Sequence, residues 1–519
     1  MSDTRNTNDR DTRYTNDVPR RPSVLIVGGS TCGLAAACEL LRLGVSVRLL
    51  ESEPEPNKGS RAILLWPLGL DVLRGLDVLA EAQASGVTLR SLHYHLDGGR
   101  TLHNDIGQEN EALLLPQEQT SALLEGVLEK LGGRVERATR VTDVSPGEDS
   151  VTVEALGADG TTELIEADWL IAADGVGSTV RERLGIEFPG VTLPTLYLAA
   201  EGHLDGGDAG IGAVHYFLRS TGPMVYAPLA GGITRIGTPV PPDTPLTPET
   251  VQSLLDQRGP AGARVKDLHE IKTFGSQERI ATRLRQGRCF LVGDAAHTHS
   301  PIGGQGLNLG LQDVHNLTWK LAGVIQGRFA PAILDTYEAE RRYAAELVVR
   351  NTRRFTRMFT LKPAQARLRN AAWRFLEASG VLRRRLVPLL AGWRVRYPEG
   401  LVVRGEGRSG GSGKGNRLLP PPGSRAPHWV TVPAGDTAHQ AAFRLLSTGA
   451  RADRMHQAAA AVADRLPGLV AHERVGRHRP GFLLLRPDGF VAAGGTTSAA
   501  LEGAERFLAD LADTAEVTA

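Results

Sequence analysis

Small residues and one carboxylate near the start of the chain have the types and spacing that hold the phosphates and sugar of a nucleotide. The segment VLIVGGSTCGLAAACELLRLGVSVRLLE spans Val24 to Glu51. A dinucleotide fingerprint needs one glycine for a tight turn and another for close packing of a helix on a strand, and Gly28 and Gly33 fit these positions. Ser30 replaces the middle glycine of the fingerprint and is small enough to be tolerated. Glu51 can accept hydrogen bonds from a ribose, so the segment predicts a site for adenosine diphosphate.

The pattern around these residues is that of a β-α-β unit. Residues 24–27 are a short, β-branched apolar run, typical of a buried strand in a parallel sheet. Residues 34–37 belong to an alanine-rich helix that Gly44 ends, and residues 45–50 form a second apolar run. The N-terminus of such a helix offers free N–H groups and the positive end of its dipole to a phosphate. These residues alone leave open whether the adenosine belongs to NAD(P) or to FAD.

Two further acids lie just beyond predicted strands, where open α/β sheets bind ligands. Asp174 follows the strand in ADWLIAADGVGSTVRERLG, and Asp294 follows the strand in GRCFLVGDAAHTHSPIGGQGLNLGLQD. In the second segment a glycine turn at 303–306 leads into a long helix that Leu307 and Asn308 begin. The N–H groups at such a helix end stabilise developing negative charge, which in a reduced flavin collects at the N1 and C2 carbonyl edge. These segments favour a flavin.

Composition narrows the class of protein. A chain of 519 residues with a net charge of +1 has the length for several domains and no charge excess that would favour nucleic acid or an anionic membrane. Its three cysteines form no CxxC pair, and their scarcity fits a reducing cytoplasm. No apolar run reaches the roughly 18 residues that a membrane span needs. We therefore expect a cytoplasmic protein with neither nucleic acid nor a membrane as a partner.

Histidines occur in two groups, and one of them, His297 with His299, invites a metal interpretation. His297 and His299 have no further cluster of ligand residues near them in the sequence, so we expect no metal there. His93, His95 and His103 alternate on a predicted hairpin, and we expect them at the surface or at the edge of a pocket. The sequence therefore predicts no metal site.

At its glycine and aspartate motifs the sequence resembles the single-component FAD-dependent aromatic hydroxylases, the para-hydroxybenzoate hydroxylase-like flavoprotein monooxygenases. The segments around Gly28, Asp174 and Asp294 look like the three signatures of that family. Within the family, GDAAHTHSPIGGQGLNLGLQD and the later LLLRPDGF, residues 483–490, look most like the hydroxylases that tailor aromatic polyketides. The resemblance is strong from about residue 22 to residue 345 and weaker beyond.

The resemblance implies an α/β fold with a Rossmann-like FAD-binding domain, an inserted β-rich substrate domain and a C-terminal thioredoxin-like domain that lacks redox cysteines. The basic residues of 350–395 are interpreted as the solvated face of helices that cover the sheet domain. The predicted division is a disordered leader over 1–21, the FAD-binding domain over 22–90, 111–189 and 278–349, the substrate-binding sheet over 91–110 and 190–277, a helical linker over 350–403, and the C-terminal domain over 404–519.

The family's residue roles carry over where the residues match. Gly28, Ser30 and Gly33 would lie against the pyrophosphate of FAD, and Glu51 would hold its adenosine ribose. The other cofactor-binding residues that the resemblance implies are Arg61 near the FAD phosphates, Gln117 at the flavin's sugar chain, Asp174 serving FAD and the nicotinamide cofactor, Asp294 at the ribityl and pyrophosphate side, and Gly306, Leu307 and Asn308 at the flavin ring. Gln119, two positions on, leaves the register of Gln117 open.

The resemblance also implies a reaction on a polycyclic, polyketide-type aromatic substrate in secondary metabolism. NADPH or NADH would reduce the FAD transiently, O2 would give a flavin C4a-hydroperoxide, and its terminal oxygen would pass to the aromatic ring. Water destroys such an intermediate, so an enclosed apolar cavity matters more than a strong acid or base. Tyr216, Tyr226 and Pro301 are the candidate substrate-binding residues, and no catalytic base is identified. A monomer or a homodimer is expected.

Other outcomes remain open at this stage. The same flavin chemistry would serve Baeyer-Villiger oxygenation, epoxidation or a hydroxylation that inactivates an antibiotic, and halogenases and oxidases also use flavins. The halogenase signature WxWxIP is absent from the sequence. A further interpretation is a flavoprotein retained for partner binding, with the C-terminal domain as its contact surface, but the intact flavin motifs disfavour it.

Overall fold

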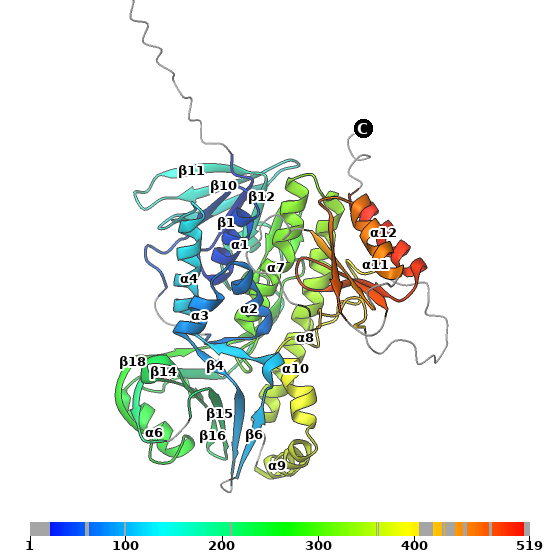
Figure 1. Cartoon of the computed structure of the whole chain (residues 1–519). Helices are drawn as coiled ribbons and strands as arrows, with labels where there is room; N and C mark the ends of the chain where they lie inside the picture. Colours follow the sequence, from blue (N-terminus) through cyan, green and yellow to red (C-terminus); the bar gives the residue numbers. More distant parts are fainter. Residues whose placement is uncertain are drawn as a thin grey trace, which may run out of the picture.

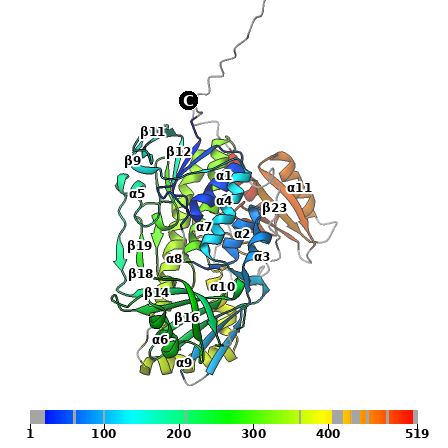
Figure 2. The same ribbon diagram turned by 90° about the vertical axis from the view of Figure 1, so that its left-hand side faces the viewer.

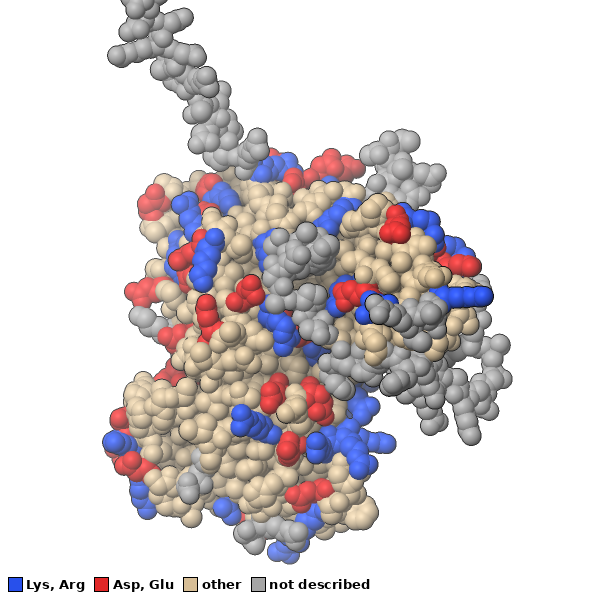
Figure 3. All heavy atoms as spheres, viewed as in Figure 1, with Lys and Arg blue, Asp and Glu red and all other residues tan. Residues whose placement is uncertain are grey.

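The computed structural model describes residues 21–57, 62–97, 100–207, 210–359, 361, 363–403, 419–427, 430, 442–449, 454–476 and 480–512. Figure 1 shows an α/β unit in the upper half, a β-sheet unit in the lower half and a smaller C-terminal unit to the right. Figure 2, turned by 90°, keeps the α/β unit above the sheet unit. None of the described helices is long and apolar enough to cross a membrane. Acidic and basic side chains are interspersed over the face shown in Figure 3.

The α/β unit is built on a six-stranded sheet that is mostly parallel. In spatial order its strands are β20 (Arg285–Gln286), β21 (Cys289–Leu291), β12 (Trp169–Ala172), β1 (Val24–Val27), β2 (Val47–Leu50) and β8 (Val135–Glu136). Every residue of β1 and β12 is buried, as expected for central parallel strands. Helix α1 (Thr31–Arg42) contacts α4 (Gln117–Lys130) and α7 (Gly306–Ile325). The predicted mixed α/β architecture is confirmed.

Smaller elements connect this sheet to the loops that follow it. Three of them are three-stranded sheets. The first contains β9 (Arg140–Pro146), β10 (Val151–Leu156) and β11 (Thr162–Ala167), the second β13 (Gly190–Thr192), β19 (Gln277–Ile280) and β22 (His297–Thr298), and the third β3 (Leu64–Leu65), β7 (Ala112–Leu114) and β4 (Val87–Leu89). The others are the helices α2 (Pro67–Gly75), α3 (Leu79–Ser85) and α5 (Thr179–Arg183). Strand β22 leads directly into the loop before α7, so it helps to place that helix end.

A seven-stranded sheet forms the second unit, and its strands all come from within 91–110 and 190–277. In spatial order they are β18 (Arg264–Phe274), β14 (Leu196–Asp205), β17 (Ile233–Val240), β16 (Gly222–Pro228), β15 (Ala213–Arg219), β5 (Ser91–Leu96) and β6 (Arg100–Asp105). Helix α6 (Pro248–Arg258) packs on one face of this sheet through Leu254 and Leu255. The opposite face is covered by helices from later in the chain.

Helix α8 (Thr336–Phe359) extends from the α/β unit to the sheet unit (Figure 1). No glycine or proline interrupts it, and Val348, Thr352 and Phe355 are buried along one side. One continuous amphipathic helix thus runs through residue 349, where the sequence pattern predicts the end of the α/β domain. Helices α9 (Pro363–Ala378) and α10 (Val387–Leu390) follow and pack on the sheet face opposite α6.

The C-terminal unit is a small α/β assembly. Its elements are β23 (Phe443–Thr448), α11 (Arg454–Arg465), β24 (Val470–Val475), β25 (Gly481–Leu485), β26 (Val491–Gly495) and α12 (Ser498–Ala512), and the strands lie in the order β24-β23-β25-β26. Strand β23 is parallel to β24 and antiparallel to β25. Aromatic rings join this unit to α7, since the ring centroid of Phe443 lies 5.6 Å from that of Trp319 in an edge-on contact.

A buried group of charges makes a second junction with the C-terminal unit. Glu340 of α8 accepts hydrogen bonds at its Oε2 from Lys320 of α7 at 2.9 Å and from Arg486 at 2.8 Å. Arg486 also pairs with Asp488, and Asn316 donates hydrogen bonds to both carboxylates. The side chains of Lys320, Glu340 and Arg486 are 0 % exposed. Burial lowers the pKa of Lys320 to about 8, although the charge of Glu340 opposes this shift. The charged form of Lys320 is therefore stabilised by Glu340.

Replacing Glu340 with glutamine should lower the melting temperature of the protein markedly. The change leaves Lys320 and Arg486 buried without their shared carboxylate, a loss that costs about 3–5 kcal/mol in comparable buried pairs. The matched control is Glu346→Gln, which removes an exposed carboxylate from the same helix. Thermal unfolding followed by circular dichroism measures both variants, and equal melting temperatures would contradict the role given to Glu340.

Candidate active site

The turn between β1 and α1 is so tightly closed that two of its residues have room for hydrogen only. Gly28 has a φ of +104°, and a Cβ on it would lie 2.4 Å from the carbonyl oxygen of Ala173. A Cβ on Gly33 would lie 1.8 Å from the carbonyl oxygen of Gly28. Ser30 is the N-cap of α1 and is exposed beside the turn. The backbone geometry is thus that of a dinucleotide-binding turn with a serine at its middle position.

Glu51 follows β2 and lies against this turn. Its Oε2 accepts a hydrogen bond from the N–H of Gly29 at 2.6 Å, and its Oε1 accepts one from the N–H of Glu53 at 2.9 Å. These bonds fix the carboxylate beside the N-terminus of α1. Each carboxylate oxygen can accept more than one hydrogen bond, so Glu51 can also receive the hydroxyls of a ribose.

Asp174 lies after β12 and carries an unmet hydrogen-bonding requirement. Its Oδ2 accepts a hydrogen bond from the N–H of Val180 at 3.1 Å, near the start of α5. Its Oδ1 is buried and has no hydrogen-bond partner among the described residues. Burial raises the pKa of this carboxyl above its usual range. A ligand hydroxyl donated to Oδ1 would satisfy the group, since leaving such an atom unpaired is costly.

The motif segments converge at the carboxyl ends of the parallel strands. The position of Asp174 is fixed by the turn itself, because a Cβ on Gly28 would lie 2.8 Å from the Asp174 nitrogen. The first turn of α1 touches the third motif, because a Cβ on Gly293 would lie 3.1 Å from the Sγ of Cys32. Asp294, the next residue, is exposed. The structure therefore brings the predicted residues of all three motifs to one edge of the sheet.

The N-terminus of α7 begins at Gly306, after a turn in which Gly303 and Gly304 have φ values of +89° and +62°. Leu307 and Asn308 are buried in the first turn of the helix, where N–H groups have no partner within the helix. The Asn308 side chain is occupied within the protein. It donates hydrogen bonds to the carbonyls of Leu64 and Gly304 at 2.8 Å and accepts one from the Trp66 N–H at 2.8 Å. Asn308 therefore positions the helix end against β3.

Asp313, which the sequence analysis did not single out, anchors the third motif. Its Oδ2 accepts hydrogen bonds from the Gly293 N–H at 3.0 Å and from His297 Nε2 at 2.6 Å, and its Oδ1 accepts one from Arg341 at 2.7 Å. Arg341 in turn donates to the Tyr397 hydroxyl at 2.8 Å. Burial opposes ionisation, but the charges of His297 and Arg341 hold the pKa of Asp313 below its usual value. In the sequence, Asp313 could be found only as the last residue of GLQD in the third motif, and no neighbouring residue indicated a role for Arg341.

His297 and His299 have different partners. His297 serves Asp313, whereas His299 Nδ1 lies 2.8 Å from the Ser300 carbonyl oxygen and so donates to it. Burial lowers the pKa of His299 to about 4. The two rings therefore do not point at one common ligand.

Three further predicted residues lie around this edge. Gln117 is the first residue of α4, and its N–H donates to the Ala62 carbonyl at 3.0 Å. Pro301 is half-buried in the loop between β22 and α7, next to Ser300, whose hydroxyl lies 3.0 Å from that of Thr356. Arg61 lies outside the described residues.

Tyr216 and Tyr226 lie on opposite faces of the seven-stranded sheet. Across β15 and β16, Tyr216 pairs with Val225 while Tyr226 pairs with His215, and neighbouring residues of a strand point to opposite faces. The expectation that both tyrosines line one cavity is therefore wrong. Tyr216 stacks on Tyr94 with ring centroids 5.1 Å apart, in the same apolar cluster as the loop before α7, whereas Tyr226 packs beneath α6.

The sheet face of Tyr216 also carries a buried ion group that the sequence analysis missed. The Arg235 side chain is 6 % exposed and pairs with Glu201 and with Glu270. Strand register puts Arg235 on this face, because it lies opposite Ala227, two residues from Val225. Each member comes from a different strand, so no local pattern could have marked the group.

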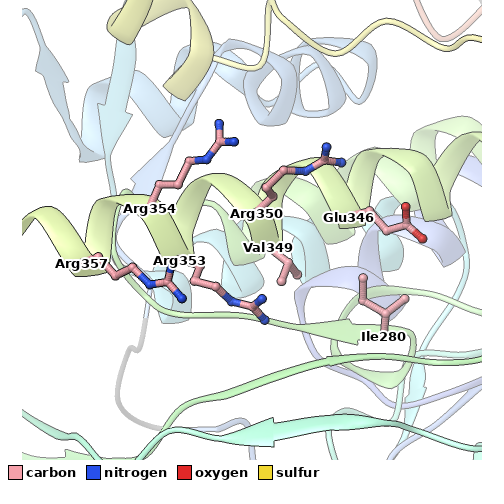
Figure 4. Close-up of a pocket in the computed structure, with 7 residues that line it drawn as sticks. All are labelled: Ile280, Glu346, Val349, Arg350, Arg353, Arg354 and Arg357. Carbon is pink, nitrogen blue, oxygen red and sulfur yellow. The ribbon is translucent and has the colours of Figure 1, made fainter.

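A surface pocket of about 400 Å³ lies along α8 beside Ile280 of β19, which pairs with His297 of the third motif. Its lining residues are Ile280, Glu346, Val349, Arg350, Arg353, Arg354 and Arg357. Arg353 and Arg357 point toward the strand of Ile280, while Arg350 and Arg354 point to the other side of the helix (Figure 4). Arg353 is paired with Glu278 at 2.7 Å. Within the described part of the chain, no acidic group lies within ion-pair distance of Arg350, Arg354 or Arg357.

Comparison with known proteins agrees with this geometry. A family described as "FAD binding domain" matches residues 21–352 of the chain. The chain belongs to this FAD-binding family. The resemblance to FAD-dependent aromatic hydroxylases seen in the sequence motifs is confirmed by its relatives.

The relatives cover between about three quarters and nearly all of the chain. The chain is 31% identical over 518 residues to a "6-methylpretetramide 4-monooxygenase" of Streptomyces rimosus, with 92% of the chain and 91% of the relative covered. It is 33% identical over 384 residues to a "Rifampicin monooxygenase" of Streptomyces venezuelae, with 73% and 80% covered. The solved anhydrotetracycline hydroxylase from Streptomyces rimosus superposes with a TM-score of 0.72 at 29% identity, covering 95% of this chain and 99% of that one.

The residues of this chain fit FAD on their own geometry. The closed turn at Gly28 leads into the N-terminus of α1, whose first N–H groups have no partner within the helix and suit a phosphate. The unpartnered Oδ1 of Asp174 calls for a hydroxyl donor, and the N-terminus of α7 offers its first N–H groups to negative charge. Glu51 is held where the ribose of an adenosine would lie. The FAD-binding family and the structure thus agree on one edge of the sheet.

Replacing Gly33 with alanine should abolish stable FAD binding. The added methyl would lie 1.8 Å from the Gly28 carbonyl oxygen, so α1 must move away from β1 and the turn must open. The matched control is Gly126→Ala in α4, where a Cβ meets no heavy atom within 4 Å. The measurement is the visible absorbance of bound flavin after purification with added FAD. A yellow Gly33→Ala protein with the flavin content of the control would refute the assignment of this turn.

Proposed function

We propose that the protein is an NAD(P)H- and O2-dependent FAD monooxygenase that hydroxylates a polycyclic aromatic molecule. The observation that carries this proposal is the convergence of three nucleotide-binding motifs beside a buried apolar sheet face. Ile302, in the loop before α7, packs against the same apolar cluster as Tyr216. An aromatic substrate held on that face would lie next to the helix end that receives the flavin.

FAD, when bound, supplies the redox chemistry by accepting a hydride from the nicotinamide cofactor and activating O2. The residues of the chain bind, orient and exclude water. The first N–H groups of α7 stabilise negative charge at the flavin edge, and Asn308 holds that helix end in place. The apolar cluster around Tyr216, Trp373 and Leu390 keeps water from the reacting carbon. Burial raises the pKa of Tyr216 to about 12, so its hydroxyl stays protonated and can donate a hydrogen bond.

The substrate class rests on the relatives. One has the name 6-methylpretetramide 4-monooxygenase and a solved neighbour is an anhydrotetracycline hydroxylase, and both cover more than nine tenths of this chain. We propose a fused-ring, polyketide-type phenol in the biosynthesis of a secondary metabolite. A second candidate is oxidation of a finished antibiotic, favoured by the similarity to a rifampicin monooxygenase. Baeyer-Villiger oxygenation and epoxidation need the same site.

We further infer that the C-terminal unit is a thioredoxin-like domain. The strand order β24-β23-β25-β26, with β23 parallel to β24 and antiparallel to β25, supports this, as does the helix α11 that connects β23 to β24. The chain has no cysteine after Cys289, so this unit has no thiol chemistry of its own. Its role is then structural.

The FAD-loaded protein should oxidise NADPH slowly alone and faster with one member of a panel of tricyclic and tetracyclic phenols. The product, analysed by mass, should be heavier by one oxygen, and its NMR spectrum should show a new ring hydroxyl. A lactone carbonyl would indicate Baeyer-Villiger oxygenation instead. A flavin-loaded protein whose NADPH oxidation responds to no aromatic and yields no oxygenated product would refute the proposal.

We infer that the arginine pocket on α8 receives the phosphates of the nicotinamide cofactor. The double variant Arg350→Ala/Arg354→Ala should raise the KM for NADPH by roughly fivefold, equivalent to about 1 kcal/mol of exposed charge attraction. FAD content and kcat should not change. Arg374→Ala, on the exposed side of α9, is the control. Steady-state oxidation of NADPH measures the effect, and a KM equal to that of the control would place the phosphates elsewhere.

A further inference from the structure

Four histidines gather on the face of the seven-stranded sheet where α6 packs, away from the loop before α7. His93 and His95 come from β5, His103 from β6 and His215 from β15. The register places His93 directly opposite both His103 and His215. Residues two apart in a strand share a face, so His95 joins them. Three adjacent strands thus bring four imidazoles together.

Three of these rings converge closely. One nitrogen from each of His93, His95 and His215 lies within 4.8 Å of the nitrogens of the other two. His95 Nε2 and His215 Nδ1 face each other at 2.9 Å, and the ring centroids of His93 and His215 are 4.8 Å apart. Two imidazole nitrogens bound to one tetrahedral zinc at the usual Zn–N length lie roughly 3.3 Å apart. A metal ion therefore requires only a small opening of this contact.

Neighbouring hydroxyls already orient two of the rings. Thr101 Oγ1 lies 2.9 Å from His95 Nδ1, which leaves Nε2 directed at the cluster, and Ser91 Oγ lies 3.0 Å from His93 Nε2, which leaves the other nitrogen of that ring. Such outer hydrogen bonds fix the tautomer and orientation of histidines that bind metals. His215 is 5% exposed, and its Nε2 has no hydrogen-bond partner among the described residues.

The ligand atoms limit the kind of metal ion that the cluster could hold. Neutral nitrogen ligands suit zinc, copper or nickel and do not suit magnesium or calcium, which take oxygen ligands.

We propose that His93, His95 and His215 bind a divalent transition-metal ion, with zinc as the probe of choice. Three imidazoles leave a fourth position for water, and the exposed His103 marks the side from which solvent reaches it. The site lies on the α6 face of the sheet, so it is independent of the flavin edge and of the proposed oxygenation. This assignment revises the expectation that the chain has no metal site.

Zinc binding to the chelator-treated, full-length protein tests the proposal without any activity measurement. Titration calorimetry should detect one site, and Co2+ at the same site should give the intense visible bands of a tetrahedral complex. His93→Gln and His95→Gln should each weaken zinc binding by at least about tenfold, a scale that loss of an outer-shell partner alone can reach. Both histidines are only half-buried, so both variants retain their packing more readily than a change at His215.

Two controls make the outcome decisive. His315→Gln changes a half-buried histidine outside the cluster and should keep full zinc affinity. His203→Gln tests the second, more exposed group of His203, Asp267 and His269, and should also keep it. Folding is checked by melting temperature without metal, and zinc should raise it only where the cluster is intact. Equal zinc affinity in wild type and in both cluster variants, loss of affinity in His203→Gln, or no binding at all would overturn the proposal.

Discussion

The hydrogen bonds and ion pairs of the buried Asp313 carboxylate hold together the edge of the sheet where the three glycine and aspartate motifs meet. The carboxylate joins the N–H of Gly293 after β21 and the imidazole of His297, both in the third motif, to the guanidinium of Arg341 in α8. Each partner satisfies part of a charge that could not otherwise be buried. Because α7 carries Asp313 and has its N-terminus at this edge of the sheet, that N-terminus is fixed relative to the turn at Gly293. The Asp313 side chain thus fixes the position of α7 and also neutralises the positive charge of Arg341.

Local sequence pattern predicts what is local in the structure. Gly28 and Gly33 could be assigned because a dinucleotide-binding turn leaves no room for a side chain at these two positions. Asp174 could be assigned because it follows a recognisable strand. Arg341 and Tyr397 could not be assigned, since Arg341 meets Asp313, and Tyr397 meets Arg341, only after long stretches of chain have folded. The two tyrosines show the same limit, because register decides which face of a sheet a residue takes and no letter in AVHYFLRS states it. The domain boundary predicted at residue 349 falls inside α8 because the recognisable sequence motifs end before this helix does.

The sheet face that carries Tyr216 is not uniformly apolar. On this face Arg235 is buried with Glu201 and Glu270, and Tyr94 stacks on Tyr216. Buried, fully paired ions of this kind hold a fixed orientation and offer directional hydrogen bonds to a phenol or ketone. Relatives that share the flavin-binding motifs but act on different ring systems are expected to differ at these residues, because the chemistry of the cofactor does not constrain them.

The junction between Glu340 and Arg486 limits how the protein can be recombined with its relatives. Helix α8 presents Glu340 to the C-terminal unit and, farther along, Phe355 to the cluster that contains Tyr216. An exchange of the last portion of the chain alone would separate Arg486 from Glu340, the α8 carboxylate that neutralises it. A functional chimaera should therefore take α8 and residues 486–489 from the same parent protein.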